Sequence, residues 1–331
     1  MPEAPPHSIL IIQLRRLGDV ILTVPAVDAL KKLYPGAKLD FLVEAPGAEA
    51  LKGHPSIDET LVYDARGIWD ALALARRIRA RRYDWVVDFL ANPRTALLTA
   101  FSGARLKAGP AHVARRWAYN RLMLQSPAPC YAALEKIRWL ASLELDVDLT
   151  QVLPRLHLAE RPANCENIVG LIPPSRKDTR RWPAASYARL GRLLRDKHGC
   201  RLKIFWGPGE KPLAEEVARA IGEHAELAPE TPTIADLARE LAACRVVVSN
   251  CAGAKHVAVA LGVPTVTIHG SSDPAVWTPV HPDHRFVRLE ELDCIGCRRN
   301  DCPYGLECLR QLPAERVLPA VSELLERRRS P

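Results

Sequence analysis

Residues 8–27 read S-I-L-I-I-Q-L-R-R-L-G-D-V-I-L-T-V-P-A-V, and this stretch decides the fold class. The apolar, β-branched run Ile9–Ile12 predicts a buried strand, and the spacing of apolar residues over Val20–Leu33 predicts a helix. The turn between them contains Gly18 and Asp19. A buried strand that runs directly into a helix is typical of an α/β protein built on a parallel sheet.

The same alternation of strands and helices continues along the chain and restarts in its second half. In the first half we expect further strands at Leu39–Val43, Thr60–Tyr63 and Trp85–Asp88, and helices at Ile68–Arg81, Thr95–Phe101 and Ala133–Leu143. In the second half we expect strands at Ile168–Ile172, Leu202–Trp206, Val246–Ser249 and Thr265–His269, and helices at Ala184–His198, Pro212–Ile221, Ile234–Ala243, Ala254–Leu261 and Pro313–Arg328. We therefore predict two Rossmann-like domains, residues 1–155 and 165–331, joined through a proline-containing linker at 150–164.

Composition narrows the class of function. Lysine and arginine number 46 against 38 aspartate and glutamate, which gives the 331-residue chain a net charge of +8 and suggests an anionic partner. Nucleic acid is a poor candidate, because the sequence has neither a helix-turn-helix signal nor a series of stacking aromatics. No apolar run is long enough to span a bilayer, and the first residues lack the features of a secretory signal, so we expect a cytoplasmic protein.

Ligands of open parallel sheets bind beyond the carboxyl ends of the strands, so the loops after the strands are the candidate sites. Asp19 follows the first strand and has two interpretations. It either caps the free amides at a helix start or acts as a general base on a hydroxyl group. The turn lacks G-x-G-x-x-G, which argues against a dinucleotide-binding oxidoreductase.

Four loops of the second half also carry candidate groups. The basic loop before Pro183 contains Arg180 and Arg181 and could bind a diphosphate at the helix start. The stretch G-P-G-E ends at Glu210, which could accept hydrogen bonds from sugar hydroxyls. The run N-C-A-G-A-K-H, residues 250–256, again leads from a strand into a helix, and Asp273 follows the last strand. Each of these residues could instead have a purely structural role.

Taken together and in this order, the motifs resemble glycosyltransferase family 9. The resemblance rests on the opening I-L-I-I-Q-L-R-R-L-G-D, the R-R-W-P loop, G-P-G-E, N-C-A-G-A-K-H-V-A-V-A-L-G and H-G-S-S-D-P-A-V-W, and it extends from Ile9 to about Leu325. It implies a GT-B fold, in which two Rossmann-like domains with parallel sheets face each other across a cleft. By that resemblance, residues 1–155 bind the acceptor, and residues 165–331, with the cysteine cluster at 294–308 and the closing helix, bind the nucleotide-sugar donor. It also implies an inverting transfer of heptose from a nucleotide-activated donor, normally ADP-heptose, to the inner core of lipopolysaccharide, without a catalytic metal.

The resemblance assigns roles to individual residues. Asp19 matches the general base, Arg180 a basic residue at the donor diphosphate, and Glu210 a ribose contact. The residues implied in donor binding are Gly18, Arg180, Arg181, Glu210, Asn250, Cys251, Gly253, His256 and Asp273. Two positions depart from the family pattern, which usually has Lys in place of Arg180 and Asp in place of Cys251. A thiol cannot replace a carboxylate as a hydrogen-bond acceptor for sugar hydroxyls.

Four of the nine cysteines, Cys294, Cys297, Cys302 and Cys308, fall within 15 residues. Disulfides are not expected in a reducing compartment, and four thiolates on a short irregular loop suit a structural Zn or Fe ion. Four free thiols are the alternative. The spacing also has a superficial similarity to iron–sulfur proteins.

The sequence therefore predicts a glycosyltransferase and leaves two other classes open. The first is a nucleotide-sugar epimerase on the same scaffold, and the second is a metal-binding or iron–sulfur protein. For the transferase we expect a nucleotide-sugar donor, an anionic glycolipid or oligosaccharide acceptor, and peripheral contact with the inner face of an anionic inner membrane.

Overall fold

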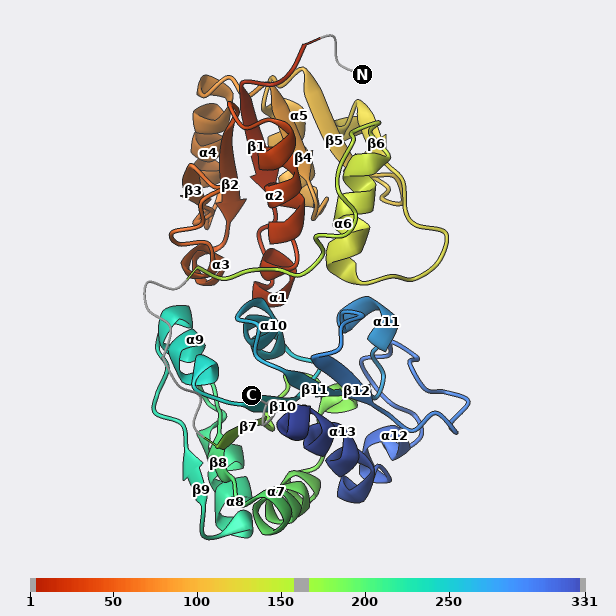
Figure 1. Ribbon diagram of the computed structural model, residues 1–331. Coiled ribbons are helices and arrows are strands. Elements are labelled where there is room, and N and C mark those ends of the chain that lie inside the picture. The colour runs from red at the N-terminus through yellow and green to blue at the C-terminus, as the bar shows by residue number, and fades with distance from the viewer. Residues whose placement is uncertain (1–3, 158–166, 328–331) are drawn as a thin grey trace. The chain divides into compact units, whose positions relative to one another are not determined.

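The computed structural model describes residues 4–157 and 167–327, and these divide into two compact α/β units, Met1–His157 and Leu158–Pro331 (Figure 1). Each unit contains one six-stranded sheet in which all paired strands are parallel. Within the described residues, no helix is both long and apolar enough to cross a membrane. The predicted α/β class with two parallel sheets is confirmed.

The N-terminal sheet has the strand order β3-β2-β1-β4-β5-β6. Its strands are β1 (Ser8–Ile12), β2 (Lys38–Val43), β3 (Glu59–Val62), β4 (Trp85–Asp88), β5 (Leu106–Pro110) and β6 (Arg121–Met123). The helices of this unit are α1 (Leu17–Ile21), α2 (Val24–Leu33), α3 (Ala45–Ala50), α4 (Ile68–Ala80), α5 (Pro93–Phe101) and α6 (Ala132–Ala141), with the 3-10 turn η1 (Arg116–Ala118). The strand order reverses between β1 and β4, which is where ligands of open α/β sheets bind.

The C-terminal sheet repeats this topology with the order β12-β11-β10-β7-β8-β9. Its strands are β7 (Ile168–Ile172), β8 (Arg201–Ile204), β9 (Ala225–Leu227), β10 (Val246–Asn250), β11 (Thr265–Ile268) and β12 (His284–Val287). Its helices are α7 (Ala184–His198), α8 (Lys211–Ile221), α9 (Ile234–Ala242), α10 (Gly253–Ala260), α11 (Pro274–Trp277), α12 (Glu307–Arg310) and α13 (Ala314–Arg327), with the 3-10 turn η2 (Asp178–Arg180). Here the order reverses between β7 and β10.

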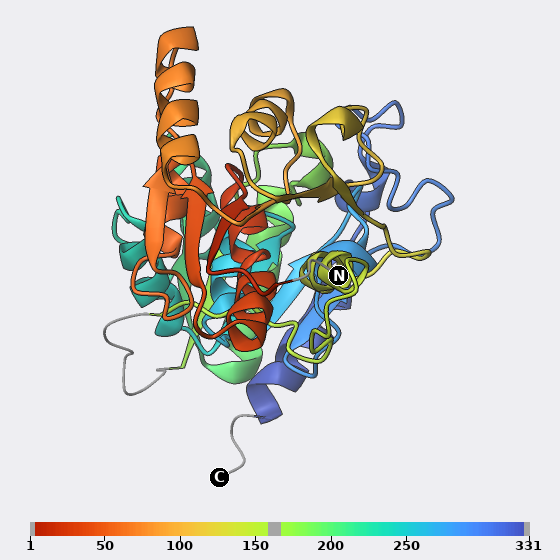
Figure 2. The same ribbon diagram turned by 90° about the horizontal axis from the view of Figure 1, so that it is seen from above.

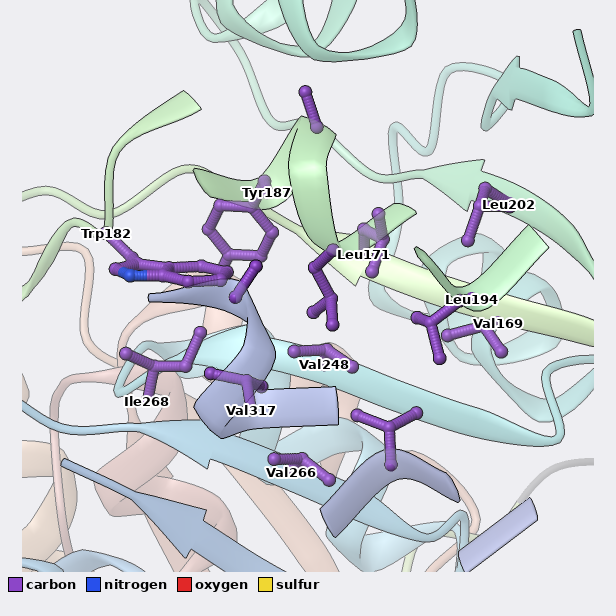
Figure 3. Packing of buried hydrophobic residues seen from close by; sticks show 14 of the residues in the cluster. Val169, Leu171, Trp182, Tyr187, Leu194, Leu202, Val248, Val266, Ile268 and Val317 are labelled. Atoms are coloured by element: carbon purple, nitrogen blue, oxygen red, sulfur yellow. The ribbon is translucent and has the colours of Figure 1, made fainter. Parts of the chain in front are cut away.

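The core of the C-terminal unit lies between its sheet and the helices α7 and α13 (Figure 3). Trp182 and Tyr187, both fully buried, meet edge to face with ring centroids 4.9 Å apart. The Trp182 indole donates to the carbonyl of Leu312, 3.0 Å away, so this large side chain is buried without an unsatisfied polar group. The basic loop is thereby anchored to the core immediately after Arg181.

The predicted helix over Val20–Leu33 is wrong in one respect, because the structure divides it into α1 and α2. The Thr23 hydroxyl donates to the carbonyl of Asp19 at 2.7 Å, a contact that competes with regular helical bonding. Pro25 lies in the first turn of α2, where its missing N–H is tolerated. Helix α1 therefore ends at Ile21, two residues after Asp19.

The sequence patterns also missed several short elements. Strands β5, β6, β9 and β12 and helices α3, α11 and α12 have no counterpart among the expected elements. The other expected strands and helices are present, with ends shifted by at most a few residues. Residues 158–164 of the predicted linker and Arg328, at the end of the last predicted helix, lie outside the described residues.

Candidate functional site

Asp19 lies in the first turn of α1, just beyond the carboxyl end of β1 at the reversal of strand order. Its carboxylate accepts a hydrogen bond from the Arg16 amide at 3.2 Å, so the capping contact expected from the sequence is present. The side chain is nevertheless only half-buried. A carboxylate that caps through one oxygen keeps lone pairs on the other, and it can still accept a proton from a ligand. The capping interpretation therefore does not exclude the catalytic one.

Sequence reasoning missed Lys136, which lies on α6 and is 7% exposed. Its ammonium group donates to the carbonyl of Asp19 at 3.2 Å. Burial lowers the pKa of Lys136, and the negative charge of Asp19 opposes that shift. The ammonium group therefore holds the backbone of Asp19 in place in the first turn of α1. No motif marks Lys136, because it is separated from Asp19 by more than a hundred residues.

Arg180 ends the turn η2 in the basic loop after β7. It is half-buried, and its Nε is buried without a hydrogen-bond partner among the described residues. An unsatisfied buried guanidinium nitrogen is costly, and an oxyanion would satisfy it. Of the predicted donor-binding residues, Arg180 is therefore the one whose surroundings most directly indicate an anionic ligand.

Arg181 and Asn250 have structural contacts instead. Arg181 donates to the carbonyl of Ser175 through Nε at 3.0 Å and through a terminal nitrogen at 2.6 Å. The Asn250 amide donates to the carbonyl of Pro173 at 2.7 Å, and its oxygen accepts from the Trp182 amide at 3.0 Å. Both side chains fix the shape of the basic loop and thereby position Arg180.

A group of cationic side chains surrounds His269 at the end of β11. Burial, and to a lesser extent the charges of Lys255, Arg288 and Arg180, lower the pKa of His269 to about 3. The neutral imidazole is held between the hydroxyls of Ser272 and Thr278, at 2.8 and 3.0 Å. Several positive charges around a buried neutral ring form an environment that favours an anion.

Lys255 is fully buried on α10 and donates to the carbonyl of Trp277. Burial lowers its pKa to about 8, and Cys251 opposes that shift. Cys251 is itself buried directly before α10, and Gly253 begins that helix. The sequence prediction named Cys251 and Gly253 individually and included Lys255 only as part of the run 250–256.

The remaining predicted residues are placed as follows. His256 is buried, and its ring faces Trp277 with centroids 6.1 Å apart. Glu210 stands before α8 and accepts from the Gly207 amide at 3.1 Å. Asp273 caps α11 through the Ala275 amide at 3.0 Å and pairs with Arg298 at 3.2 Å. Gly18 lies buried in the first turn of α1.

The four clustered cysteines line one cavity of about 170 Å³ in the C-terminal unit, together with Thr179 and Ser271. Burial, and to a lesser extent the three neighbouring cysteines, raise the pKa of Cys308 to about 11. Three of these cysteines lie in the segment after β12, and Cys308 lies on α12. Among residues 4–157 and 167–327, however, no three Cys, His, Asp or Glu side chains are gathered closely enough to hold a metal ion as they stand.

Comparison with known proteins gives the family. The sequence pattern of glycosyltransferase family 9 (heptosyltransferase) matches residues 71–307. Lipopolysaccharide heptosyltransferase 1 of Salmonella typhimurium is 27% identical over 292 residues, which cover 81% of this chain and 90% of that protein.

Solved structures of similar proteins share the fold along almost the whole chain. A glycosyl transferase of family 9 from Veillonella parvula has a TM-score of 0.84 at 23% identity and covers 97% of both chains. The Escherichia coli heptosyltransferase WaaC with ADP-2-deoxy-2-fluoro heptose has a TM-score of 0.76 at 24% identity, with 96% of this chain and 99% of that one covered. The two parallel sheets thus correspond to the GT-B fold that the sequence predicted.

Proposed function

Because the chain belongs to glycosyltransferase family 9, the heptosyltransferase family, we propose that it transfers heptose from ADP-heptose to the inner core of a lipopolysaccharide precursor. The relatives named as lipopolysaccharide heptosyltransferases support the sugar and the acceptor class. The observation in this chain that carries the proposal is the buried, unsatisfied Nε of Arg180 beside a group of cations, since it suits the diphosphate of a nucleotide-sugar.

The proposed reaction is a single displacement with inversion. Asp19 takes the proton of the acceptor hydroxyl, the acceptor oxygen bonds to the anomeric carbon, and the bond from that carbon to the diphosphate oxygen breaks. ADP leaves with the electron pair, and Arg180 stabilises the negative charge that develops on it. In this proposal Lys136 is a positioning residue that holds the backbone of Asp19 in place.

Donor binding tests the assignment of Arg180. We expect Arg180→Ala to raise the dissociation constant of ADP by roughly 10- to 150-fold, because a charge-assisted hydrogen bond worth about 1.5–3 kcal/mol is lost. Arg176→Ala removes the same charge from an exposed position of the same loop and is the matched control. Isothermal titration measures both. Equal affinities for the two variants would remove Arg180 from the diphosphate site.

A product assay separates transfer from epimerisation. With ADP-heptose and a deacylated inner-core acceptor, a transferase forms a new glycosidic product and releases ADP, whereas an epimerase needs no acceptor. The family match favours the transferase. Consumption of the donor at the same rate without an acceptor, and without a glycosidic product, would support the epimerase.

The membrane is the second partner that we propose, through a surface of the N-terminal unit. A cavity of about 500 Å³ lies between α4 and α5 and is lined largely by apolar side chains, with Arg66 and Arg94 among them. Trp69 is 77% exposed and Ile68 is 68% exposed on α4, and Phe101 is 61% exposed at the end of α5. In Figure 2 the orange helix α4 extends beyond the sheet of its own unit.

Apolar side chains next to arginines match a membrane that contains anionic lipid. The apolar side chains would enter the boundary between headgroups and acyl chains, and each arginine near the surface would add about 1 kcal/mol. Three further arginines, Arg76, Arg77 and Arg79, follow on α4. This surface would keep a cytoplasmic enzyme at the inner face of the inner membrane, where an acylated acceptor is found.

Vesicle binding tests this surface. We expect Ile68→Ser to weaken co-sedimentation with phosphatidylglycerol-containing vesicles by roughly tenfold, because the buried apolar area is lost. Val280→Ser removes a similar side chain that is 99% exposed in the C-terminal unit, and it should leave binding unchanged. Equal binding of both variants, or equal binding to vesicles of phosphatidylcholine alone, would contradict the proposal.

A further inference from the structure

The cavity between α4 and α5, called the groove below, has a shape that contact with a flat bilayer does not use. Its volume of about 500 Å³ lies within the usual range of ligand sites, roughly 300–1,000 Å³. Apart from Tyr63, Arg66 and Arg94, the side chains that line it are apolar. A bilayer surface covers the rim of such a groove, whereas a single flexible apolar chain can fill it.

The groove follows two helices that leave the same edge of the N-terminal sheet. Helix α4 follows β3 and α5 follows β4, so both begin beyond the carboxyl ends of parallel strands, at the edge where Asp19 follows β1. Ala71 and Ala75 are four residues apart, so they lie on one face of α4 and leave space beside it. From Ile68 to Ala75 the groove follows α4 for about 10 Å.

The end of the groove at this edge is positively charged. The Asp70 carboxylate accepts from the Arg66 amide at 3.1 Å, and the Asn92 side chain accepts from the Arg94 amide at 2.9 Å. The Arg94 guanidinium also lies over the ring of Tyr63, 6.0 Å from its centroid. Within residues 4–157, neither guanidinium forms an ion pair with a carboxylate. Two such cations suit an anionic headgroup.

At the opposite end the two helices are joined. The Arg79 guanidinium of α4 donates to the carbonyl of Phe101, the last residue of α5, at 3.2 Å. Beneath the groove, Tyr63 and Leu98 are buried in one core cluster with Leu74. A ligand therefore has its charged group at the arginines, and the length of apolar chain that the groove accommodates is limited.

We propose that the groove binds one acyl chain of a glycolipid acceptor, with the anionic headgroup at Arg66 and Arg94. This assignment rests on the proposed function, because that function brings the acceptor hydroxyl to Asp19 on the same edge of the sheet. The chain extends along the helices away from this edge, so the headgroup sugars stay on the side of the base. Binding of the chain thereby helps to orient the acceptor for transfer.

A length limit distinguishes the groove from a bilayer. Each methylene group that leaves water strengthens binding about fourfold, so affinity rises with chain length in both environments. In the groove this gain ends when the space between the arginines and Phe101 is filled. Insertion into a bilayer or a micelle continues to improve with every added methylene group.

A series of soluble amphiphiles tests the groove without any reaction. The probes are alkyl phosphates from butyl to dodecyl phosphate, below their critical micelle concentrations, and isothermal titration measures their affinity for the wild-type protein. We expect one molecule per chain, with a dissociation constant that falls about fourfold per methylene group and levels off before dodecyl phosphate. A gain that continues up to dodecyl phosphate, or no saturable binding, would overturn the proposal.

A substitution that fills the groove tests its position. We expect Ala71→Phe to weaken binding of octyl phosphate by roughly tenfold or more, because the ring occupies the space of the chain. Ala73→Phe is the matched control, since Ala73 is an exposed residue of the same helix outside the lining of the groove. Ala75→Phe is a second filling variant, and the chain-length series with wild type remains decisive if both filling variants fail to fold.

The same variants distinguish other occupants of the groove. Ala71→Phe adds apolar area to α4, so contact with a bilayer alone predicts equal octyl phosphate binding by Ala71→Phe and Ala73→Phe. That result would overturn the groove as a chain site. A dimer that Ala71→Phe alone dissociates in analytical ultracentrifugation, together with no binding of octyl phosphate, would assign the groove to a second copy of the chain.

Transfer assays connect the groove to the acceptor. The wild type should have a KM roughly tenfold lower for an acceptor with one octanoyl chain than for the deacylated acceptor, and Ala71→Phe should narrow this difference. Equal KM values for the two acceptors, in protein that binds octyl phosphate, would overturn the acceptor as the source of the chain. Absence of a glycosidic product with either acceptor would instead contradict the proposed function.

Discussion

Asp19 is the residue at which a capping role and a catalytic role predict different effects of the same substitution. Replacement by Asn keeps an oxygen that can accept from the Arg16 amide and removes the basic carboxylate. We therefore expect Asp19→Asn to lower turnover by roughly 10²- to 10⁴-fold, with donor affinity and melting temperature nearly unchanged. Single-turnover transfer, donor titration and thermal unfolding on the same protein measure these three quantities.

Asp236→Asn is the control for Asp19. Asp236 occupies the same position in the first turn of α9 and accepts from the Thr233 amide at 3.3 Å. This variant should retain full turnover. Near-normal transfer by well-folded Asp19→Asn would refute the assignment of the base.

Lys255 gives the fold a pH dependence. Its pKa is about 8 in the folded protein and near the ordinary 10.5 in the unfolded chain, so between these values the unfolded chain binds more protons. The free energy of unfolding of the wild type should therefore rise relative to that of Lys255→Met as pH increases from 8 to 10.5, by about 3 kcal/mol in total. Urea unfolding at several pH values measures the difference.

The exposed Lys211 provides the comparison for Lys255. Lys211→Met should track the wild type across the whole pH range, since its side chain is about half exposed. If the difference in free energy of unfolding between wild type and Lys255→Met does not change with pH, burial does not lower the pKa of Lys255.

The sequence predicts a site residue when that residue lies next to a recognisable strand, and fails when the residue reaches the site from a distant part of the chain. Asp19 and Arg180 could be proposed because each stands in a loop directly after a recognisable strand. Lys136 could not, because it approaches Asp19 only when α6 packs beside α2. Arg181 and Asn250 were grouped with the donor contacts, whereas their hydrogen bonds are to the protein backbone, and the sequence contains no signal for that difference.

At the scale of elements, the contact between α7 and α8 depends on a glycine. A Cβ atom on Gly191 would lie 2.6 Å from Cδ1 of Ile221. We expect Gly191→Ala to lower the free energy of unfolding by about 1–3 kcal/mol, because the helices have to separate. In an Ile221→Ala background the same substitution should be neutral or stabilising by up to about 1 kcal/mol, since only the helix propensity of alanine remains. A denaturation double-mutant cycle measures the coupling, and additivity would contradict the close approach.

Element prediction succeeded where segments were long or fully buried. Strands β1, β4, β7 and β10 consist mostly of buried apolar residues, a pattern that is easily detected in a sequence. The missed strands β6 and β9 have three residues each, and the longer β5 contains Lys107, Gly109 and Pro110, residues that are rare in strands. Pairing with β4 and β6 stabilises β5 in spite of this composition, and such long-range pairing has no local sequence signal.

At the scale of the whole molecule, the described residues form separate cores. One buried cluster lies entirely in the C-terminal unit, and the others lie entirely in the N-terminal unit. We therefore expect residues 1–157 and 158–331, expressed separately, each to unfold cooperatively. ADP should raise the melting temperature of the second fragment alone, because a ligand stabilises only the folded state that binds it.

Differential scanning fluorimetry on the two fragments measures both expectations. The second fragment with Arg180→Ala is the control, and its melting temperature should respond much less to ADP. Stabilisation of the first fragment by ADP would contradict the assignment of Arg180, in the C-terminal unit, to the donor diphosphate.

The outermost strands of both sheets, β3, β6, β9 and β12, contain three or four residues each. An exposed strand edge is a template on which a second copy of a protein can add its own strand. Edges this short offer few spare amides and carbonyls to such a copy. When several copies of the chain meet at high concentration, for instance while several ribosomes translate one message, the sheets therefore expose little strand edge on which a fibrous aggregate could grow.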